Sequence, residues 1–222
     1  MSRGARQQNN YAFIDSQNLN LGTQKVGWKM NWGKFLHVLR ERYGVTNAYL
    51  FIGYLPEYEA MYEQMHELGY MIVLKPTVGA LDEPPKDTKR DAEGEADNSK
   101  QNPKLYDDKK DDKRDDKKDD KKDGKRPEED KKPAVKGNID AELVMYAMKE
   151  MPNYDKAIIV SGDGDFYCLV EYLAAQHKLL HLMAPNWQYS SLLKPYEQYI
   201  VRLDKHRRTL AYHDRKKPRS AR

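Results

Sequence analysis

The chain has 222 residues, of which 39% are hydrophobic and 33% charged, and its formal net charge is +4. This mixture permits a globular domain only if many of the charges lie outside the core. No run approaches the ~18 consecutive apolar residues of a membrane span, and the single cysteine excludes an internal disulfide and a cysteine-rich zinc site. The start, MSRGARQQNN, lacks the apolar stretch of a secretory signal. We therefore expect a cytoplasmic protein without a membrane partner.

Short β-rich runs alternate with segments that have helical spacing along most of the chain. This alternation is typical of a parallel sheet covered by helices, and it predicts an α/β fold. In chain order the five clearest runs are YAFID, NAYLFIGY, YMIVLK, KAIIVSG and KLLHLM, and a weaker sixth is YIVRL.

Two helices are predicted in the first half of the chain, one before and one after the second run. The first carries apolar residues at helical spacing, namely Trp32, Phe35, Leu36, Val38 and Leu39. We expect it to end near Gly44, and the second, over 57–68, to end at Gly69, because glycine tolerates the positive φ common at helix C-termini.

Further helices are predicted in the second half. Asn138 is a candidate N-cap for a helix that Pro152 bounds. Another helix is expected over 166–176, and Ser190 or Ser191 is expected to cap a short helix after the fifth strand.

A charged segment interrupts this pattern between the third run and the next helix. Residues 82–136 hold 19 acidic and 18 basic side chains. Such a segment has few apolar residues to bury and cannot offset the entropy of ordering itself, so we expect a disordered loop or a solvated helix. Its position makes it an insertion within one domain rather than a linker between two.

Acidic residues follow the runs at places where ligands collect in a parallel sheet. Asp15 ends the first run, Asp163 and Asp165 follow the fourth, and Asp140 opens the helix after the insertion. The carboxyl ends of parallel strands meet at one edge, so these groups are expected to share a cleft. Their mutual repulsion would raise their pKa values unless a cation neutralised them, and Mg²⁺ or Mn²⁺ prefers such oxygen ligands.

Two polar residues near these aspartates are candidate phosphate or water ligands. The glycines of SGDGDF free the backbone to turn sharply, and Ser161 in this motif is expected to position a phosphate or a metal-bound water. Asn18, in FIDSQN, is expected to bind an acidic neighbour or the substrate phosphate.

The three motifs FIDSQN, KGNID and SGDGDF, in that order, resemble the NYN domain of PIN-like nucleases, particularly the LabA-like group. The resemblance spans about residues 9–204, with the insertion at 82–136 and a basic tail at 205–222 set apart. It implies a Rossmann-like, three-layer α/β/α fold with a central, mainly parallel sheet of five or six strands. It also implies a metal-dependent ribonuclease whose acidic positions fall on Asp15, Asp140, Asp163 and Asp165, with Asn18 beside the first.

The predicted function is hydrolysis of single-stranded RNA, by endonucleolytic cleavage, through Mg²⁺ or Mn²⁺ held by the four aspartates. A noncatalytic RNA-binding or regulatory module with the same fold is the alternative. RNA versus DNA, endo versus exo action, and monomer versus homodimer stay open. A haloacid dehalogenase-type phosphatase is disfavoured, because it needs a second aspartate two residues after the first and Gln17 stands there.

Aromatic and basic side chains follow the first and fifth runs and are candidates to contact RNA. Bases can stack on aromatic rings and lysines can contact phosphates, although Trp32 is also a candidate core residue. The expected substrate-binding residues are Trp28, Trp187, Tyr189 and Lys136. The tail from Lys205, with eight basic residues against Asp214, is expected to add nonspecific affinity for nucleic acid.

Two other features favour structural over functional interpretations. His177 and His181 have the spacing of a helical metal pair, but the residues between them look like the start of a strand. Cys168 lies in an apolar helical segment and is expected to be a small core residue rather than a nucleophile.

Overall fold

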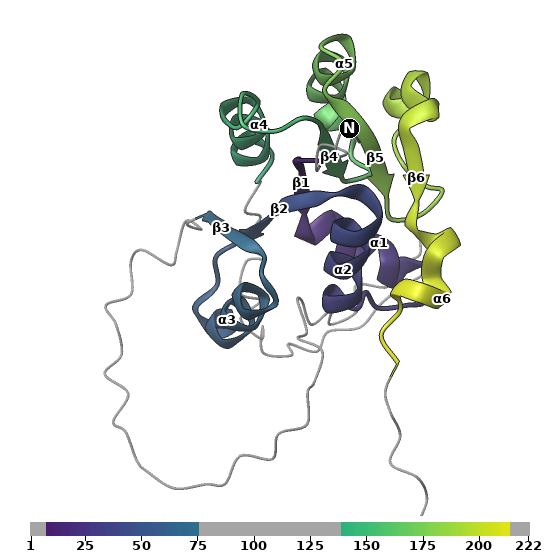
Figure 1. The fold of residues 1–222 in the computed structure, drawn as a ribbon. Helices are drawn as coiled ribbons and strands as arrows, with labels where there is room; N and C mark the ends of the chain where they lie inside the picture. Colours follow the sequence, from purple (N-terminus) through teal and green to yellow (C-terminus); the bar gives the residue numbers. More distant parts are fainter. Residues whose placement is uncertain (1–7, 76–138, 214–222) are drawn as a thin grey trace, which may run out of the picture.

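A six-stranded sheet forms the centre of the computed structural model, which describes residues 8–75 and 139–213 (Figure 1). The strand order is β3-β2-β1-β4-β5-β6, and every neighbouring pair is parallel. This is the order of a doubly wound, Rossmann-like sheet. All six predicted runs form strands: β1 (Asn10–Asp15), β2 (Val45–Gly53), β3 (Met71–Lys75), β4 (Ala157–Val160), β5 (Leu179–Ala184) and β6 (Ile200–Arg202).

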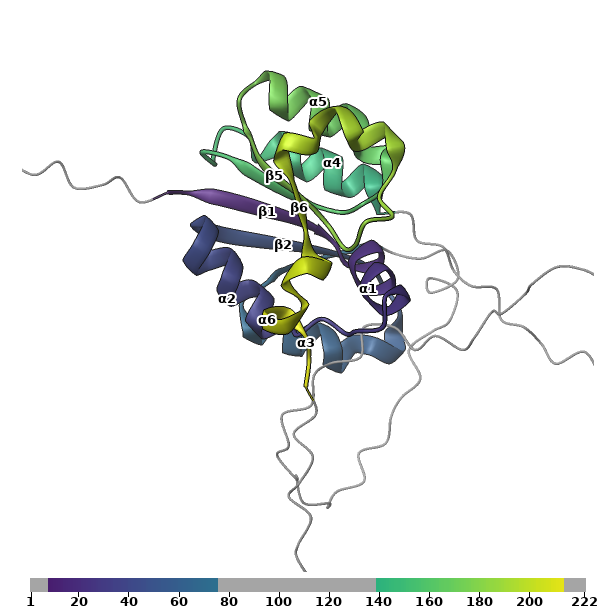
Figure 2. The same ribbon diagram turned by 90° about the vertical axis from the view of Figure 1, so that its right-hand side faces the viewer.

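Helices cover both faces of the sheet, which confirms the predicted three-layer α/β fold (Figure 2). One face is covered by α1 (Ser16–Lys25), α2 (Trp32–Tyr43), α3 (Glu59–Leu68) and α6 (Arg207–Leu210). The other is covered by α4 (Asp140–Lys149), α5 (Tyr167–Ala175) and the 3₁₀ segment η3 (Ser191–Tyr199). Shorter 3₁₀ turns are η1 (Pro56–Tyr58), η2 (Gly164–Phe166) and η4 (Leu203–His206). Within the described ranges, no helix has the length and hydropathy needed to cross a membrane.

Alternation along the central strands explains why the core has two halves. On β1, Ala12 and Ile14 pack with the helices of one face, whereas Tyr11 and Phe13 pack with those of the other. Successive side chains of a strand point to opposite faces, so a strand covered on both sides is apolar at nearly every position. All six residues of β1 are buried accordingly.

The predicted helix ends agree with the structure in three places. Gly44 and Gly69 follow α2 and α3 with φ of 60° and 100°, the left-handed conformation that glycine adopts without steric cost. Ser190 precedes η3, and its side chain accepts a hydrogen bond from the backbone N–H of Leu192.

Helix α1 was not predicted, because its sequence, SQNLNLGTQK, carries little apolar periodicity. It buries Leu19 but leaves Leu21 exposed. The helix begins directly after β1, so Asp15 is both the last strand residue and the N-cap. Helix α4 begins at Asp140 with Ile139 at the N-cap position and no side-chain cap bond. The predicted cap, Asn138, lies outside the described residues.

The described structure continues past residue 204, the predicted C-terminal boundary of the domain, into α6. Leu210 and Ala211 are buried in the core beneath α2, and Ala211 forms a β-bridge with Met30. The backbone N–H of Asn31 also donates to the carbonyl of Leu210 at 2.8 Å. The fold therefore continues past the first cations of the predicted basic tail. The charged insertion at 82–136 and the tail from Asp214 lie outside the described residues.

Candidate active site

The carboxyl ends of β1 and β4 lie side by side in the middle of the sheet. Strands β2 and β3 are added in turn on one side of β1, and strands β5 and β6 are added in turn on the opposite side, next to β4. In doubly wound sheets, the crevice at such a change of direction is where ligands bind. Asp15 ends β1, and the segment 161–166 follows β4, so two of the three predicted acidic motifs, FIDSQN and SGDGDF, reach this crevice.

Asp15 is held by hydrogen bonds from both sides of the crevice. Its Oδ1 accepts from the backbone N–H of Asn18 at 3.0 Å, the bond that caps α1. Its Oδ2 accepts from the hydroxyl of Ser161 at 3.2 Å. The side chain of Asp15 is therefore fixed in orientation, and the residue is only 5% exposed.

Burial raises the pKa of the Asp15 carboxyl from 3.8 to about 6. Smaller contributions in the same direction come from the negative charges of Asp140 and Asp163, while the hydrogen bonds from Asn18 and Ser161 lower the pKa. The sequence predicted a raised pKa from repulsion between carboxylates. The direction is confirmed for Asp15, but loss of hydration is the larger cause.

The SGDGDF loop is shaped by side chains that accept from its own backbone. The N–H of Asp163 donates to Ser161 Oγ at 3.1 Å, and the N–H of Asp165 donates to Asp163 Oδ1, also at 3.1 Å. The N–H of Gly162 donates to Asn18 Oδ1 at 2.8 Å, which ties the loop to α1. These bonds set the loop at the mouth of the crevice.

All four predicted aspartates line one cavity of about 480 Å³ at this edge. They come from three separate segments: the end of β1, the start of α4 and the loop after β4. The rest of the lining is Gln17, Asn18, Leu21, Gly22, Lys25, Ile139, Gly162, Pro185, Asn186, Gln188 and Tyr189. Asp15 lies at the buried end of this set, whereas Asp165 is exposed.

The donor set of the cavity suits a hard divalent cation that keeps much of its water. Carboxylate oxygens are the ligands that Mg²⁺ and Mn²⁺ prefer, and Mg²⁺ is usually held by one or two carboxylates with several waters. Within residues 8–75 and 139–213, no three histidine, cysteine or acidic side chains converge closely enough to form a ready-made metal cage. The four carboxylates are of the chemical type that such an ion prefers, but the described side chains do not by themselves form a complete set of metal ligands.

The other predicted binding residues differ in exposure and in their distance from the cavity. Tyr189 lines the cavity and Asn18 borders it, but Ser161 is fully buried and its hydroxyl contacts Asp15, so it orients a carboxylate rather than a phosphate. Trp28 is also buried, which corrects the expectation that its ring is open to a base. Trp187, by contrast, is 55% exposed. Lys136 lies outside the described residues.

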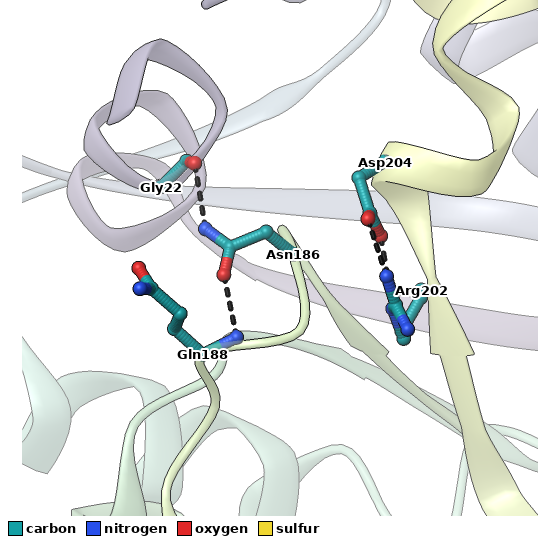
Figure 3. Close-up of polar contacts among 5 residues, drawn as sticks. All are labelled: Gly22, Asn186, Gln188, Arg202 and Asp204. Carbon is teal, nitrogen blue, oxygen red and sulfur yellow. Dashed lines mark hydrogen bonds and ion pairs between the residues drawn. The ribbon is translucent and has the colours of Figure 1, made fainter. Parts of the chain in front are cut away.

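Several lining residues were missed from the sequence. Lys25 and Gly22 belong to α1, the helix that was not predicted. Asn186 follows β5 and anchors its loop: its Nδ2 donates to the carbonyl of Gly22 at 2.8 Å, and its Oδ1 accepts from the N–H of Gln188 at 2.7 Å (Figure 3). A polar residue two positions after the end of a strand, at this edge of the sheet, was the available signal.

The histidines and the cysteine lie away from the cavity. His177 is in a turn with φ of 55°, and His181 is inside β5 with its ring against Tyr43, so the two do not share a helix face. Cys168 is exposed on α5, which corrects its predicted place in the core. Neither histidine nor the cysteine lines the acidic cavity.

The family model described as "NYN domain" matches residues 113–203. The matched range includes Asp140, Asp163 and Asp165, and Asp15 joins them through the fold. It is narrower than the 9–204 over which the motifs indicated the resemblance.

A search of curated proteins gives no match. Among solved structures, the chain is similar to a protein of unknown function from Vibrio parahaemolyticus, with a TM-score of 0.58 at 17% identity over 96% of this chain and 100% of that one. At this identity the likeness concerns the fold alone. The family match bears out the resemblance seen in the acidic motifs: residues 113–203 match the NYN domain, which is consistent with a member of the PIN-like nuclease superfamily.

Proposed function

We propose that this protein is a metal-dependent nuclease that hydrolyses phosphodiester bonds of single-stranded RNA. The observation that carries the proposal is the meeting of Asp15, Asp140, Asp163 and Asp165, from three separate segments, around one cavity at the centre of the sheet edge. Carboxylates gathered in this way cost stability unless a cation balances them. The NYN match supports the nuclease class.

The carboxylates would hold Mg²⁺ or Mn²⁺, which lowers the pKa of a bound water and stabilises the leaving oxygen of a phosphodiester. Asp15 supplies a fixed oxygen at the buried end, because Asn18 and Ser161 restrain both of its oxygens. Asp163 and Asp165 supply oxygens nearer the mouth, where a phosphate enters. Tyr189 and Lys25 line the wall of the cavity, and from there they would contact the substrate.

Proton transfer in this site falls to carboxylates and water. The described lining of the cavity contains no histidine. The raised pKa of Asp15 means that its carboxylate, before a cation binds, takes up a proton near pH 6. A cation in the cavity favours the ionised form of Asp15, so we expect cation binding to release a proton.

A noncatalytic RNA-binding module is the second candidate. One observation favours it: no ready-made cage of three metal-binding side chains occurs in the part of the chain that the structure describes. Such a module would keep the fold and bind RNA without turnover.

Cleavage of an end-labelled single-stranded RNA, in Mn²⁺, Mg²⁺ or EDTA, tests the proposal. Asp163→Asn is the test variant, because it removes one charge while keeping a similar shape. Asp155→Asn is the matched control: Asp155 lies just before β4, at the opposite edge of the sheet, where it accepts from the N–H of Asn9.

We expect metal-dependent cleavage by the wild type and by Asp155→Asn, and its loss in Asp163→Asn. Binding without cleavage in any of the metals would favour the noncatalytic module. Cleavage that persists in EDTA, or in Asp163→Asn, would exclude the proposed site. Parallel reactions with single-stranded DNA of the same sequence decide between RNA and DNA.

A further inference from the structure

Trp187 is an exposed residue that lines two surface hollows next to the acidic cavity. It lies in the loop between β5 and η3 and is 55% exposed. Trp187 lines two neighbouring hollows, and both share lining residues with the acidic cavity: Lys25 and Gln188 in one hollow, and Tyr189 in the other. A strand that leaves the acidic cavity by either hollow therefore passes the indole.

The backbone on both sides of Trp187 is fixed. Asn186, before it, donates to the carbonyl of Gly22 in α1, and its Oδ1 accepts from the N–H of Gln188, after it (Figure 3). Pro185 is buried directly against Gly22, so the loop has little freedom to move toward the helix. An exposed aromatic ring on a restrained loop binds with a small loss of conformational entropy.

Arg202 supports the indole. Its Cζ lies 5.9 Å from the centre of the Trp187 ring. Its Nε and Nη2 donate to the two carboxylate oxygens of Asp204 at 3.1 and 2.6 Å, a bidentate pair that fixes the guanidinium plane (Figure 3). Because Asp204 balances its charge, Arg202 serves as a support for the ring rather than as a phosphate ligand.

Three other cations line the hollows beside Trp187, together with the acidic residues Asp204 and Glu197. Lys25 and Arg207 line one hollow and Lys205 lines the other, and no carboxylate of the described residues forms an ion pair with any of the three. Arg207 uses Nη2 to donate to the carbonyl of Gly27, which holds its side chain in place. Next to the acidic cavity there are thus an exposed indole ring and three cations that form no ion pair with a described carboxylate.

We propose that Trp187 is a stacking platform for an unpaired base of the strand whose phosphodiester enters the acidic cavity, with Lys25, Lys205 and Arg207 contacting its phosphates. An aromatic face with nearby cations is how proteins bind single strands without reading their sequence. A paired base cannot present its face to the ring, so the subsite selects single strands over duplex. The inference rests on the proposed function only for the role of the acidic cavity.

Intrinsic fluorescence provides a direct measurement of stacking. The chain has three tryptophans, and Trp28 and Trp32 are buried. Trp28 nevertheless lines one of the two hollows, so only the quenching that the wild type shows and Trp187→Ala lacks is assigned to Trp187. Titrations of the full chain in EDTA measure binding without turnover, so failure of the nuclease proposal leaves this test intact.

Trp187→Ala and Trp187→Phe are the test variants, with Tyr172→Ala as a matched control, because Tyr172 is an exposed aromatic on α5 that lines none of these hollows. For a short single-stranded RNA we expect about a fivefold or greater rise in Kd for Trp187→Ala, the loss of one stacked base. Trp187→Phe should retain most of the affinity, and Tyr172→Ala all of it. An RNA of abasic ribose phosphates should bind the wild type and Trp187→Ala equally.

Quenching by single-stranded RNA together with that pattern of affinities supports the platform. Three results would overturn it. They are an unchanged affinity for single-stranded RNA in Trp187→Ala, a loss of affinity for duplex RNA as large as that for single-stranded RNA, and a loss of affinity of the same size for the abasic strand. Equal losses in Trp187→Phe and Trp187→Ala would also overturn it, because the phenyl ring keeps a stacking face. Thermal melting of each variant verifies that the fold is intact, as expected for a side chain that is more than half exposed.

Discussion

The hydroxyl of Ser161 donates to Asp15 Oδ2 at 3.2 Å and so joins residues that are 146 positions apart in the sequence. Ser161 Oγ also accepts a hydrogen bond from the backbone N–H of Asp163 at 3.1 Å. One buried hydroxyl therefore sets both the orientation of Asp15 and the start of the loop that carries the other aspartates.

Ser161→Ala should shift the pH dependence of cleavage. The hydrogen bond from Ser161 lowers the pKa of Asp15, so its loss raises that pKa further and moves the acid limb of the rate profile to higher pH. Stability should fall by about 1–3 kcal/mol, because the N–H of Asp163 loses its acceptor. Thr23→Val is the control, since it removes a buried hydroxyl bonded only within α1. An unmoved acid limb in Ser161→Ala would contradict the positioning role.

Asp15→Asn should stabilise the cation-free protein above pH 6 and have little effect near pH 4. The folded pKa of about 6 lies above the usual 3.8, so the folded state binds more protons between these values. Wild-type stability therefore falls as pH rises through this window, by about 3 kcal/mol. Asparagine does not titrate and avoids that loss. Urea unfolding of the wild type and of Asp15→Asn, in EDTA at pH 4 and at pH 8, measures the difference in stability at each pH. An equal difference at the two pH values would exclude burial of the charge as the cause.

Adding Mg²⁺ extends the same measurement. A cation that binds the folded state alone stabilises it in proportion to its occupancy. We expect Mg²⁺ to raise the unfolding midpoint of the wild type at pH 8 more than that of Asp15→Asn. An identical rise in both proteins would place the ion elsewhere.

Gly22→Ala should disturb the contact between α1 and the Trp187 loop. A Cβ at Gly22 would lie 2.6 Å from the Cβ of Pro185, whose ring has no flexible end to give way. We expect a loss of about 1–3 kcal/mol of unfolding free energy from overpacking. Gly33→Ala is the matched control: its Cβ would meet Leu68 at an ordinary 3.5 Å, and it should gain about 0.5–1 kcal/mol from helix propensity. Chemical denaturation compares the two, and a Gly22→Ala protein as stable as the wild type would refute the close packing.

Truncation after His213 separates the basic tail from the fold. It removes five basic residues and one acidic residue, and it leaves the buried Leu210 and Ala211 in place. We expect unchanged thermal stability, weaker binding of single-stranded RNA, and a salt dependence that is shallower by about 0.7 in slope for each lost phosphate contact. Truncation after Asp204 should instead destabilise the protein, because it removes those two core residues. An unaltered salt slope after the first truncation would show that the tail does not bind RNA.

The strands could be predicted from the sequence because short runs of neighbouring residues encode them. The six apolar runs and the glycines that end α2 and α3 depend on alternation, β propensity and backbone freedom, which neighbouring residues encode. Helix α1 was missed for the same reason: it has few apolar residues, and the capping by Asp15 and the packing of Leu19 support it instead.

The sequence by itself determined that the aspartates lie together at one edge of the sheet. They follow the first and fourth strands, and the carboxyl ends of parallel strands meet at the same edge. Only the tertiary structure decided which side chains meet there. It buried Ser161 and Trp28, exposed Trp187, and placed Asn18 against the N–H of Gly162, 144 residues away. Burial and hydrogen bonds between distant segments depend on how the layers pack, and no local pattern of residues carries that information.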